Sequence, residues 1–111
     1  MDFDPNAAST AGSGLFGLPC GPESAHVHVL GVPFEATTSY RPGTANAPVA
    51  VLAASRQVDL FDLHFGKPYE HGLWMGPLDP RFGAWDREAR RLAGPIIERG
   101  GAGPGDEDAV A

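Results

Sequence analysis

A polar segment over residues 35–41 carries the side chains best suited to bind a small molecule in this 111-residue chain. Its hydroxyl oxygens could accept hydrogen bonds from a ligand, and its carboxylate could offer a counter-charge. The candidate ligand-binding residues are Glu35, Thr37, Thr38, Ser39, Tyr40 and Arg41. The alternative is a capped turn whose hydroxyls bond their own backbone, with Arg41 in a surface ion pair. A pocket would also need an opposing wall.

Metal and nucleophile chemistry have weaker support. His26 and His28 stand two apart on a predicted strand and share a face, but no carboxylate or thiolate stands nearby to complete a metal shell. The simpler interpretation places both at the solvated entrance of the strand. Cys20 is the only cysteine and has no basic neighbour, so it is expected to be inert. Asp59 and Asp62 resemble a carboxylate pair, yet a solvated role is the simpler one.

The polar segment follows a predicted strand. Residues 26–34 form a nearly continuous apolar run, typical of a strand covered on both faces, although Pro33 should weaken its pairing. Pro42 and Gly43 predict a tight turn at the far end of the segment. In open α/β sheets, ligands bind at loops that leave the carboxyl ends of strands. The position of the segment therefore favours a ligand-binding role.

The chain after the polar segment contains a predicted helix and two short segments predicted to be extended. The helix is expected over residues 48–56, with Asn46 as its N-cap. After it, residues 58–63 alternate enough to predict a strand or an extended edge. A further short extended piece is predicted over residues 73–75. Strand, polar loop and helix together make half of a βαβ unit.

A second helix has clearer start and stop signals. Asp79 can cap it, Pro80 can take its first position, and Gly100 stands where it should end. Its apolar residues repeat at three- and four-residue spacing; they are Phe82, Trp85, Ala89, Leu92 and Ile96. Pro95 removes one ladder bond, which predicts a kink or a break near Ala93.

The chain divides into three predicted parts. Residues 1–25 are an irregular N-terminal arm, which either contacts a larger body or is a frayed terminus. Residues 26–99 form a partial domain. Residues 100–111 are an acidic tail expected to be disordered, because its composition cannot bury enough apolar surface.

Charge and hydropathy exclude several function classes. The formal net charge is −6 and the eight Lys and Arg residues are scattered, which argues against nucleic-acid binding. No apolar run has the length of a membrane span, and the first residues lack the pattern of a signal peptide. The expected compartment is the cytoplasm.

One stretch resembles a known family. Residues 29–43, followed by Pro48 and residues 53–57, are similar to the start of the ureohydrolase superfamily, which includes arginase and agmatinase. The closest likeness is to bacterial agmatinase-type proteins. The resemblance covers roughly residues 13–100, and Ala47 stands where many relatives carry Gly.

The resemblance implies the N-terminal part of a three-layer α/β/α parallel-sheet fold, incomplete in this chain. It also implies hydrolysis of a guanidino C–N bond, with residues 35–41 contacting the guanidino substrate. Two metal ions, usually manganese and sometimes nickel, would activate the attacking water. The family takes its metal ligands from Gly-Gly-Asp-His, Asp-Ala-His-x-Asp and Asp-x-Asp motifs. None of these motifs occurs in this chain, so no metal ligand and no catalytic residue is assigned.

Two functions follow as hypotheses. The first is an N-terminal fragment of an agmatinase-type hydrolase, inactive alone because one strand and two helices cannot complete a sheet. The second is a non-catalytic module that docks on a ureohydrolase subunit or on a separate C-terminal half. A homo-oligomer fits either hypothesis.

Overall fold

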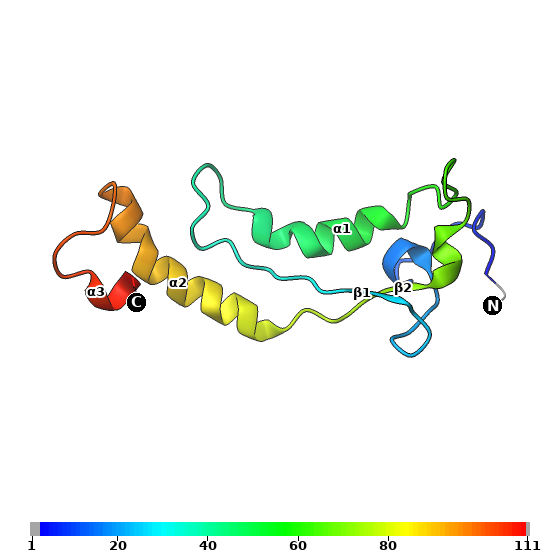
Figure 1. Ribbon diagram of the computed structural model, residues 1–111, viewed down its shortest axis with the longest axis horizontal. Helices are drawn as coiled ribbons and strands as arrows, with labels where there is room; N and C mark the ends of the chain where they lie inside the picture. Colours follow the sequence, from blue (N-terminus) through cyan, green and yellow to red (C-terminus); the bar gives the residue numbers. More distant parts are fainter. Residues whose placement is uncertain (1–2, 111) are drawn as a thin grey trace. The chain divides into compact units, whose positions relative to one another are not determined.

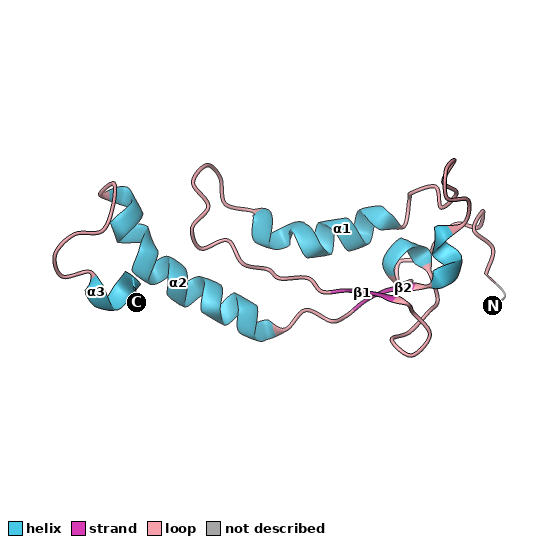
Figure 2. Ribbon diagram, viewed as in Figure 1, coloured by secondary structure: helices cyan, strands magenta, loops and turns pink. Residues whose placement is uncertain are grey.

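The structure, a computed structural model, describes residues 3–110 (Figure 1). It contains helices and short strands joined by long loops (Figure 2). The elements in chain order are η1 (Leu15–Gly17), β1 (Val27–Val29), η2 (Thr44–Asn46), α1 (Ala47–Ser55), η3 (Pro68–His71), β2 (Leu73–Met75), α2 (Pro80–Glu98) and α3 (Glu107–Val110). They belong to two compact units. The first unit comprises the chain up to Gly31 together with Pro48–Leu78, and the second comprises Val32–Ala47 with the chain from Asp79 onward.

The first unit contains a parallel pair of strands. β1 pairs with β2 in the register Val27 with Leu73, His28 with Trp74 and Val29 with Met75. Because β1 and β2 are parallel and α1 lies between them in the chain, they make a βαβ connection. This arrangement is that of a partial α/β fold, and it confirms the extended piece predicted over residues 73–75.

Two strand predictions need correction. β1 is shorter than the predicted run over residues 26–34, because its only partner among the described residues is three residues long and Pro33 has no N–H to donate. The segment over residues 58–63 is not a strand. It ends in a tight turn, in which a bridge joins Asp62 to Gly66 and the Asp62 carboxylate accepts the N–H groups of His64 and Phe65.

The buried centre of the first unit is small and lies beside β2. Leu18 is 2 % exposed and Leu15 is 4 % exposed. Cys20 is buried too, and its thiol donates to the Leu73 carbonyl oxygen over 3.1 Å. This burial is consistent with the inert role expected of Cys20. Residues of the predicted N-terminal arm thus supply most of the buried apolar side chains in this unit.

Ser55 is a buried polar residue that joins α1 to η1. Its hydroxyl accepts the Phe16 N–H over 2.9 Å and donates to the Leu52 carbonyl oxygen over 2.8 Å. Phe16 has a positive φ of 56°, an uncommon conformation for a residue other than glycine. The Ser55 hydroxyl therefore supports a strained turn as well as a helix end.

The Ser55→Ala variant is expected to lose about 1–3 kcal/mol of unfolding free energy, because the Phe16 N–H would be buried without an acceptor. Urea denaturation followed by circular dichroism measures this loss. Ser24→Ala is the matched control, since the Ser24 hydroxyl is exposed and bonds only the nearby Gly21 carbonyl. Equal stability of both variants would contradict the bridging role of Ser55.

α1 begins differently from the sequence prediction. Asn46 is not a side-chain N-cap: it lies inside η2, and its N–H donates to the Gly43 carbonyl oxygen. Ala47 has ordinary helical angles, φ −54° and ψ −43°, so this position does not require glycine. The helix over Ala47–Ser55 otherwise confirms the predicted one.

The second unit is built on α2. The Asp79 carboxylate accepts the Arg81 N–H over 2.9 Å, and Pro80 takes the first helical position, as predicted. The predicted break near Ala93 is wrong, because the helix continues through Pro95 to Glu98. Pro95 lies in the last turn and removes only one ladder bond, and the axis of α2 bends in this region in Figure 1.

The last described residues form short-range contacts, while the disorder predicted over residues 100–111 stays a prediction. Glu107–Val110 form the single turn α3. The Asp106 carboxylate accepts the Gly103 N–H over 2.8 Å and forms an ion pair with Arg99 over 2.6 Å. The boundaries predicted at residues 25 and 99 stay predictions.

Candidate functional site

The Glu35 carboxylate is the centre of the polar loop in the second unit. Its Oε2 atom accepts the Gly43 N–H over 2.6 Å, the Ala45 N–H over 2.9 Å and the Thr44 hydroxyl over 3.2 Å. Its Oε1 atom accepts a guanidinium N–H of Arg90 over 2.8 Å. One side chain therefore closes the loop over residues 35–45 and ties it to α2.

These bonds keep Glu35 ionised. The Ala45 and Gly43 backbone N–H groups, with smaller contributions from Arg90 and the Thr44 hydroxyl, lower the pKa of the Glu35 carboxyl to about 2. The side chain is only 10 % exposed. A carboxylate with this pKa is not a general base near neutral pH, because the ideal pKa for that role lies near the working pH.

The backbone of Glu35 is also bound. Its N–H donates to the Asp86 carboxylate over 2.6 Å, and its carbonyl oxygen accepts both the N–H and the hydroxyl of Thr38. Arg90 lies 3.8 Å from the Asp86 carboxylate, four residues away on the same helix. Asp86 and Arg90 thus hold the start of the loop from α2, one through the backbone and one through the side chain.

The predicted ligand-binding residues divide into two groups. Glu35 and Thr38 bond within the loop itself, which is the capped-turn alternative. The other four have exposed side chains without a hydrogen bond to the described part of the chain; they are Thr37, Ser39, Tyr40 and Arg41. The Arg41 guanidinium lies over the Tyr40 ring, 5.3 Å from its centroid. The exposed group offers hydroxyls and a cation, whereas the Glu35 charge is already paired.

Sequence reasoning missed the partners of this loop. Arg90 stands 55 residues after Glu35, and Asp86 stands 51 residues after it. The four-residue spacing of Asp86 and Arg90 is typical of a pair on one helix face, but no local signal connects either residue to the loop.

The histidines do not form a metal site. The carbonyl oxygen of His71 can only accept, so His26 donates to it from Nδ1 over 2.6 Å; likewise His28 donates from Nε2 to the Pro22 carbonyl over 3.0 Å. Across residues 3–110, no group of three or more His, Cys, Asp or Glu side chains is placed to hold a metal ion. The side chains described here do not fit a two-metal centre.

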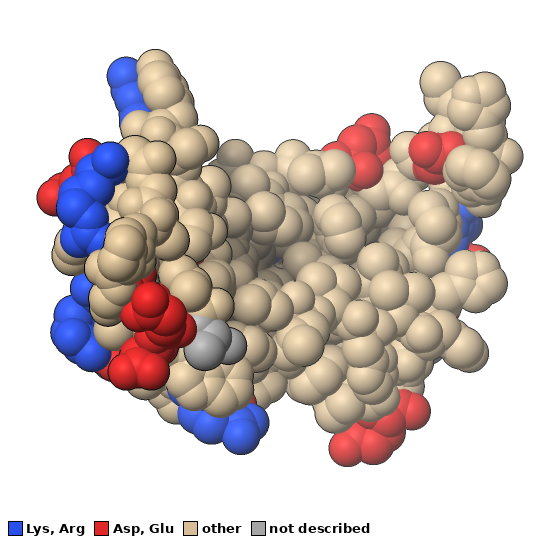
Figure 3. All heavy atoms as spheres, turned by 60° about the vertical axis from the view of Figure 1, so that its left-hand side comes forward, with Lys and Arg blue, Asp and Glu red and all other residues tan. Residues whose placement is uncertain are grey.

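The charged surface has no extended basic patch on the face drawn in Figure 3, where basic atoms lie beside acidic ones. Ion pairs within α2 account for part of this pattern, such as Arg91 with Glu88 at 2.7 Å. Within the described residues, no helix combines the length and apolar character needed to span a bilayer.

Comparison with known proteins identifies the family. The model of the arginase family matches residues 25–80, which include β1, the polar loop, α1 and β2. The chain belongs to the arginase family. The resemblance inferred from residues 29–43 is therefore confirmed, over a shorter region than residues 13–100.

The curated relatives of this arginase-family chain are much longer than it is. An N(1)-aminopropylagmatine ureohydrolase of Synechocystis sp. is 47 % identical over 49 residues, which are 44 % of this chain and 16 % of the relative. A protein of the same name from Thermus thermophilus is 37 % identical over 71 residues, 63 % of this chain and 24 % of the relative. The chain thus spans between about a sixth and a quarter of these relatives. No solved structure matches it.

Proposed function

We propose that this chain is the N-terminal portion of an agmatinase-type hydrolase of guanidino C–N bonds and is inactive alone. The observation that carries the proposal is the arginase-family match over residues 25–80 in a chain that spans at most 24 % of the length of the two relatives described above. The names of those relatives point to a linear guanidino amine such as N(1)-aminopropylagmatine as substrate. Agmatine and guanidine are alternative substrates.

The exposed apolar surface supports the need for further structure. Parallel sheets are normally covered on both faces, yet Val27 of β1 is 45 % exposed and Leu30 beside it is 68 % exposed. Val49 and Val51 of α1 are 59 % and 55 % exposed. α1 is apolar on most of its surface, as is typical of a helix buried on several sides. We infer that additional strands and helices cover these side chains in the active protein.

The role proposed for this chain is to supply a substrate-facing loop. The exposed hydroxyls of Thr37, Ser39 and Tyr40 could accept hydrogen bonds from a guanidino group. Glu35 would act as a positioning residue, because its carboxylate holds the loop closed. The metals of the family, proposed as two manganese or nickel ions, would be bound by residues outside this chain.

An assay of urea release tests this proposal. The isolated 111-residue chain, supplied with manganese or nickel and with agmatine, arginine, guanidine or N(1)-aminopropylagmatine, is expected to release no urea above the protein-free background. In parallel, the matching 71 residues of the Thermus thermophilus relative are replaced by their counterparts from this chain. The hybrid is expected to retain measurable urea release. Turnover by the isolated chain, or a folded but inactive hybrid, would contradict the proposal.

The same exposed apolar residues favour a second candidate function, a non-catalytic module that docks on a ureohydrolase subunit or on a separate C-terminal half. Size-exclusion chromatography of the co-expressed pair distinguishes it, since a stable complex of equal stoichiometry is expected. An isolated chain that stays unfolded and monomeric beside its partner would count against this module. Either function suits a cytoplasmic protein, because the single cysteine is a buried free thiol.

A further inference from the structure

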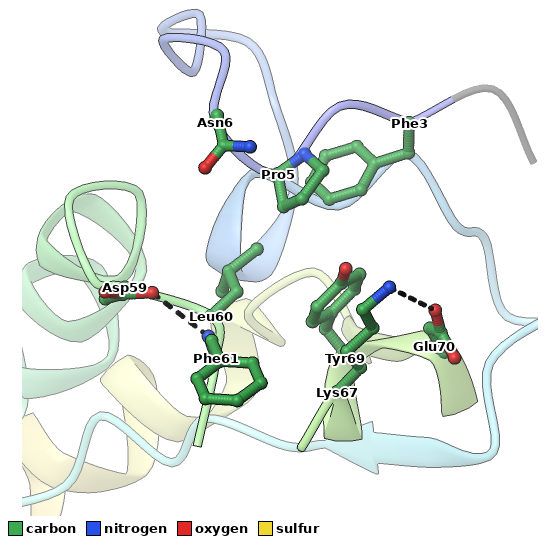
Figure 4. Close-up of a pocket in the computed structure, with 9 residues that line it drawn as sticks. All are labelled: Phe3, Pro5, Asn6, Asp59, Leu60, Phe61, Lys67, Tyr69 and Glu70. Atoms are coloured by element: carbon green, nitrogen blue, oxygen red, sulfur yellow. Dashed lines mark hydrogen bonds and ion pairs between the residues drawn. The ribbon is translucent and has the colours of Figure 1, made fainter. Parts of the chain in front are cut away.

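A cavity in the first unit is lined by aromatic rings and charged groups that the proposed hydrolase function does not use. Its volume is about 620 Å³. Phe3 and Pro5 line it from the N-terminal segment, while Lys67, Tyr69 and Glu70 line it from the start of η3 (Figure 4). The segment that follows α1 supplies the remaining wall.

The aromatic part of the lining consists of three rings. Phe3 and Tyr69 meet edge to face, with ring centroids 6.0 Å apart. Phe61 is 58 % exposed and lies on the wall that follows α1. Aromatic faces carry negative electrostatic potential and attract cations placed over them. The rings therefore favour a positively charged ligand that also has an apolar body.

The charged part of the lining is acidic in balance. Asp59 and Glu70 contribute two carboxylates, and Lys67 contributes one ammonium group. One Asp59 oxygen accepts the backbone N–H of Phe61 over 3.0 Å, which fixes the carboxylate on this wall of the cavity. A carboxylate has several acceptor positions, so Asp59 can still bind a second donor.

Lys67 contributes the ammonium group of the lining, which is paired with Glu70. Its Nζ atom lies 3.8 Å from a Glu70 oxygen. Figure 4 draws this ion pair together with Tyr69. Both side chains are more than half exposed, at 59 % and 63 %, so the pair is weak. Lys67 neutralises Glu70 and leaves the charge of Asp59 uncompensated among the seven lining residues named here.

We propose that this cavity binds a small organic cation, a primary alkylammonium ion, between its aromatic rings and the Asp59 carboxylate. The site lies wholly within the first unit. It is separate from the loop over residues 35–41, and it does not depend on hydrolytic activity.

Titration of the full 111-residue chain with n-butylammonium chloride, followed by amide NMR shifts, tests the site. The amides of residues 59–61 and 67–70 are expected to shift in a saturable manner. Neutral n-butanol, which has the same chain length, is expected to bind at least about threefold more weakly. Equal binding of n-butanol would overturn the proposal, and so would an unfolded chain that binds neither compound.

Two variants should change the affinity in opposite directions. Asp59→Asn keeps the acceptor for the Phe61 N–H but removes the charge, so n-butylammonium should bind roughly threefold or more weakly. Lys67→Met removes the competing ammonium and frees Glu70, so binding should tighten. Glu23→Gln changes the net charge away from the cavity and should have no effect. Weaker binding by Lys67→Met, or unchanged binding by Asp59→Asn, would overturn the assignment.

Discussion

Replacing Gly31 by valine is expected to destabilise the first unit by about 3 kcal/mol, near the upper end for an overpacked site. A Cβ atom at position 31 would lie 2.6 Å from Leu78 Cδ2, 2.7 Å from Pro48 Cβ and 3.0 Å from Met75 Cε. Gly31 is buried, and its three neighbours come from the start of α1, from the end of β2 and from the segment after β2. Because Pro48 is rigid, the backbone must shift to admit a side chain.

Thermal unfolding and hydrogen exchange at the β1 amides measure this effect. The matched control is Gly83→Ala on α2, where a Cβ atom would meet only the Arg87 guanidinium at an ordinary 3.5 Å. That variant should gain roughly 0.5–1 kcal/mol, because alanine is the better helix former. If Gly31→Val unfolded at the wild-type temperature, the close packing around Gly31 would be wrong.

Loss of the Glu35 carboxylate is expected to open the loop of the second unit. In Glu35→Gln the Arg90 ion pair is lost, and the single amide oxygen cannot replace both carboxylate oxygens. Exchange of the Gly43 and Ala45 amide protons should accelerate about tenfold near neutral pH, as expected when such bonds are lost. Glu23→Gln removes the same charge from a residue of the first unit that makes no bond to the loop, and it should leave these amides unchanged.

Low pH should also open the loop over residues 35–45 in the unsubstituted chain, because it protonates Glu35. The pKa of Glu35 is lowered from 4.5 to about 2 in the folded protein, so its contribution to stability is fully present above pH 4.5. That contribution declines as the pH falls from 4.5 through about 2. An NMR titration of the Gly43 and Ala45 amides should show a midpoint near 2, and Glu35→Gln should remove it. A midpoint near 4.5 would show that the carboxylate is not bound by these N–H groups.

Both predictions rest on contacts between residues far apart in the chain, whereas the features that the sequence predicts correctly depend on neighbouring residues. The start of α2 follows from Asp79 and Pro80, because a cap and a first-turn proline act within three or four residues. The strand at Leu73–Met75 follows from a short apolar run beside loop signals. The family resemblance likewise depended on short stretches close together in the chain: residues 29–43, Pro48 and residues 53–57.

The errors have a common cause. The extent of β1 depends on the length of its partner, which begins 46 residues later in the register. The turn η2, which comes just before α1, is bound through the Ala45 N–H by the Glu35 carboxylate, 10 residues earlier, and not capped by the Asn46 side chain. Periodicity and capping rules consider only residues a few positions apart, so they predict neither of these long-range contacts.

The candidate site shows the same division. The sequence by itself determined the position of the polar loop, which follows an extended apolar run and precedes a helix. It also determined which side chains the loop carries. Only the tertiary structure decided which of these side chains are bonded and which are exposed. It pairs Glu35 with Arg90 and Asp86 of α2 and leaves Thr37, Ser39, Tyr40 and Arg41 exposed. The physical reason is that local signals set backbone conformation, whereas the partner of a charged side chain is chosen by whichever distant segment the fold brings within hydrogen-bond distance.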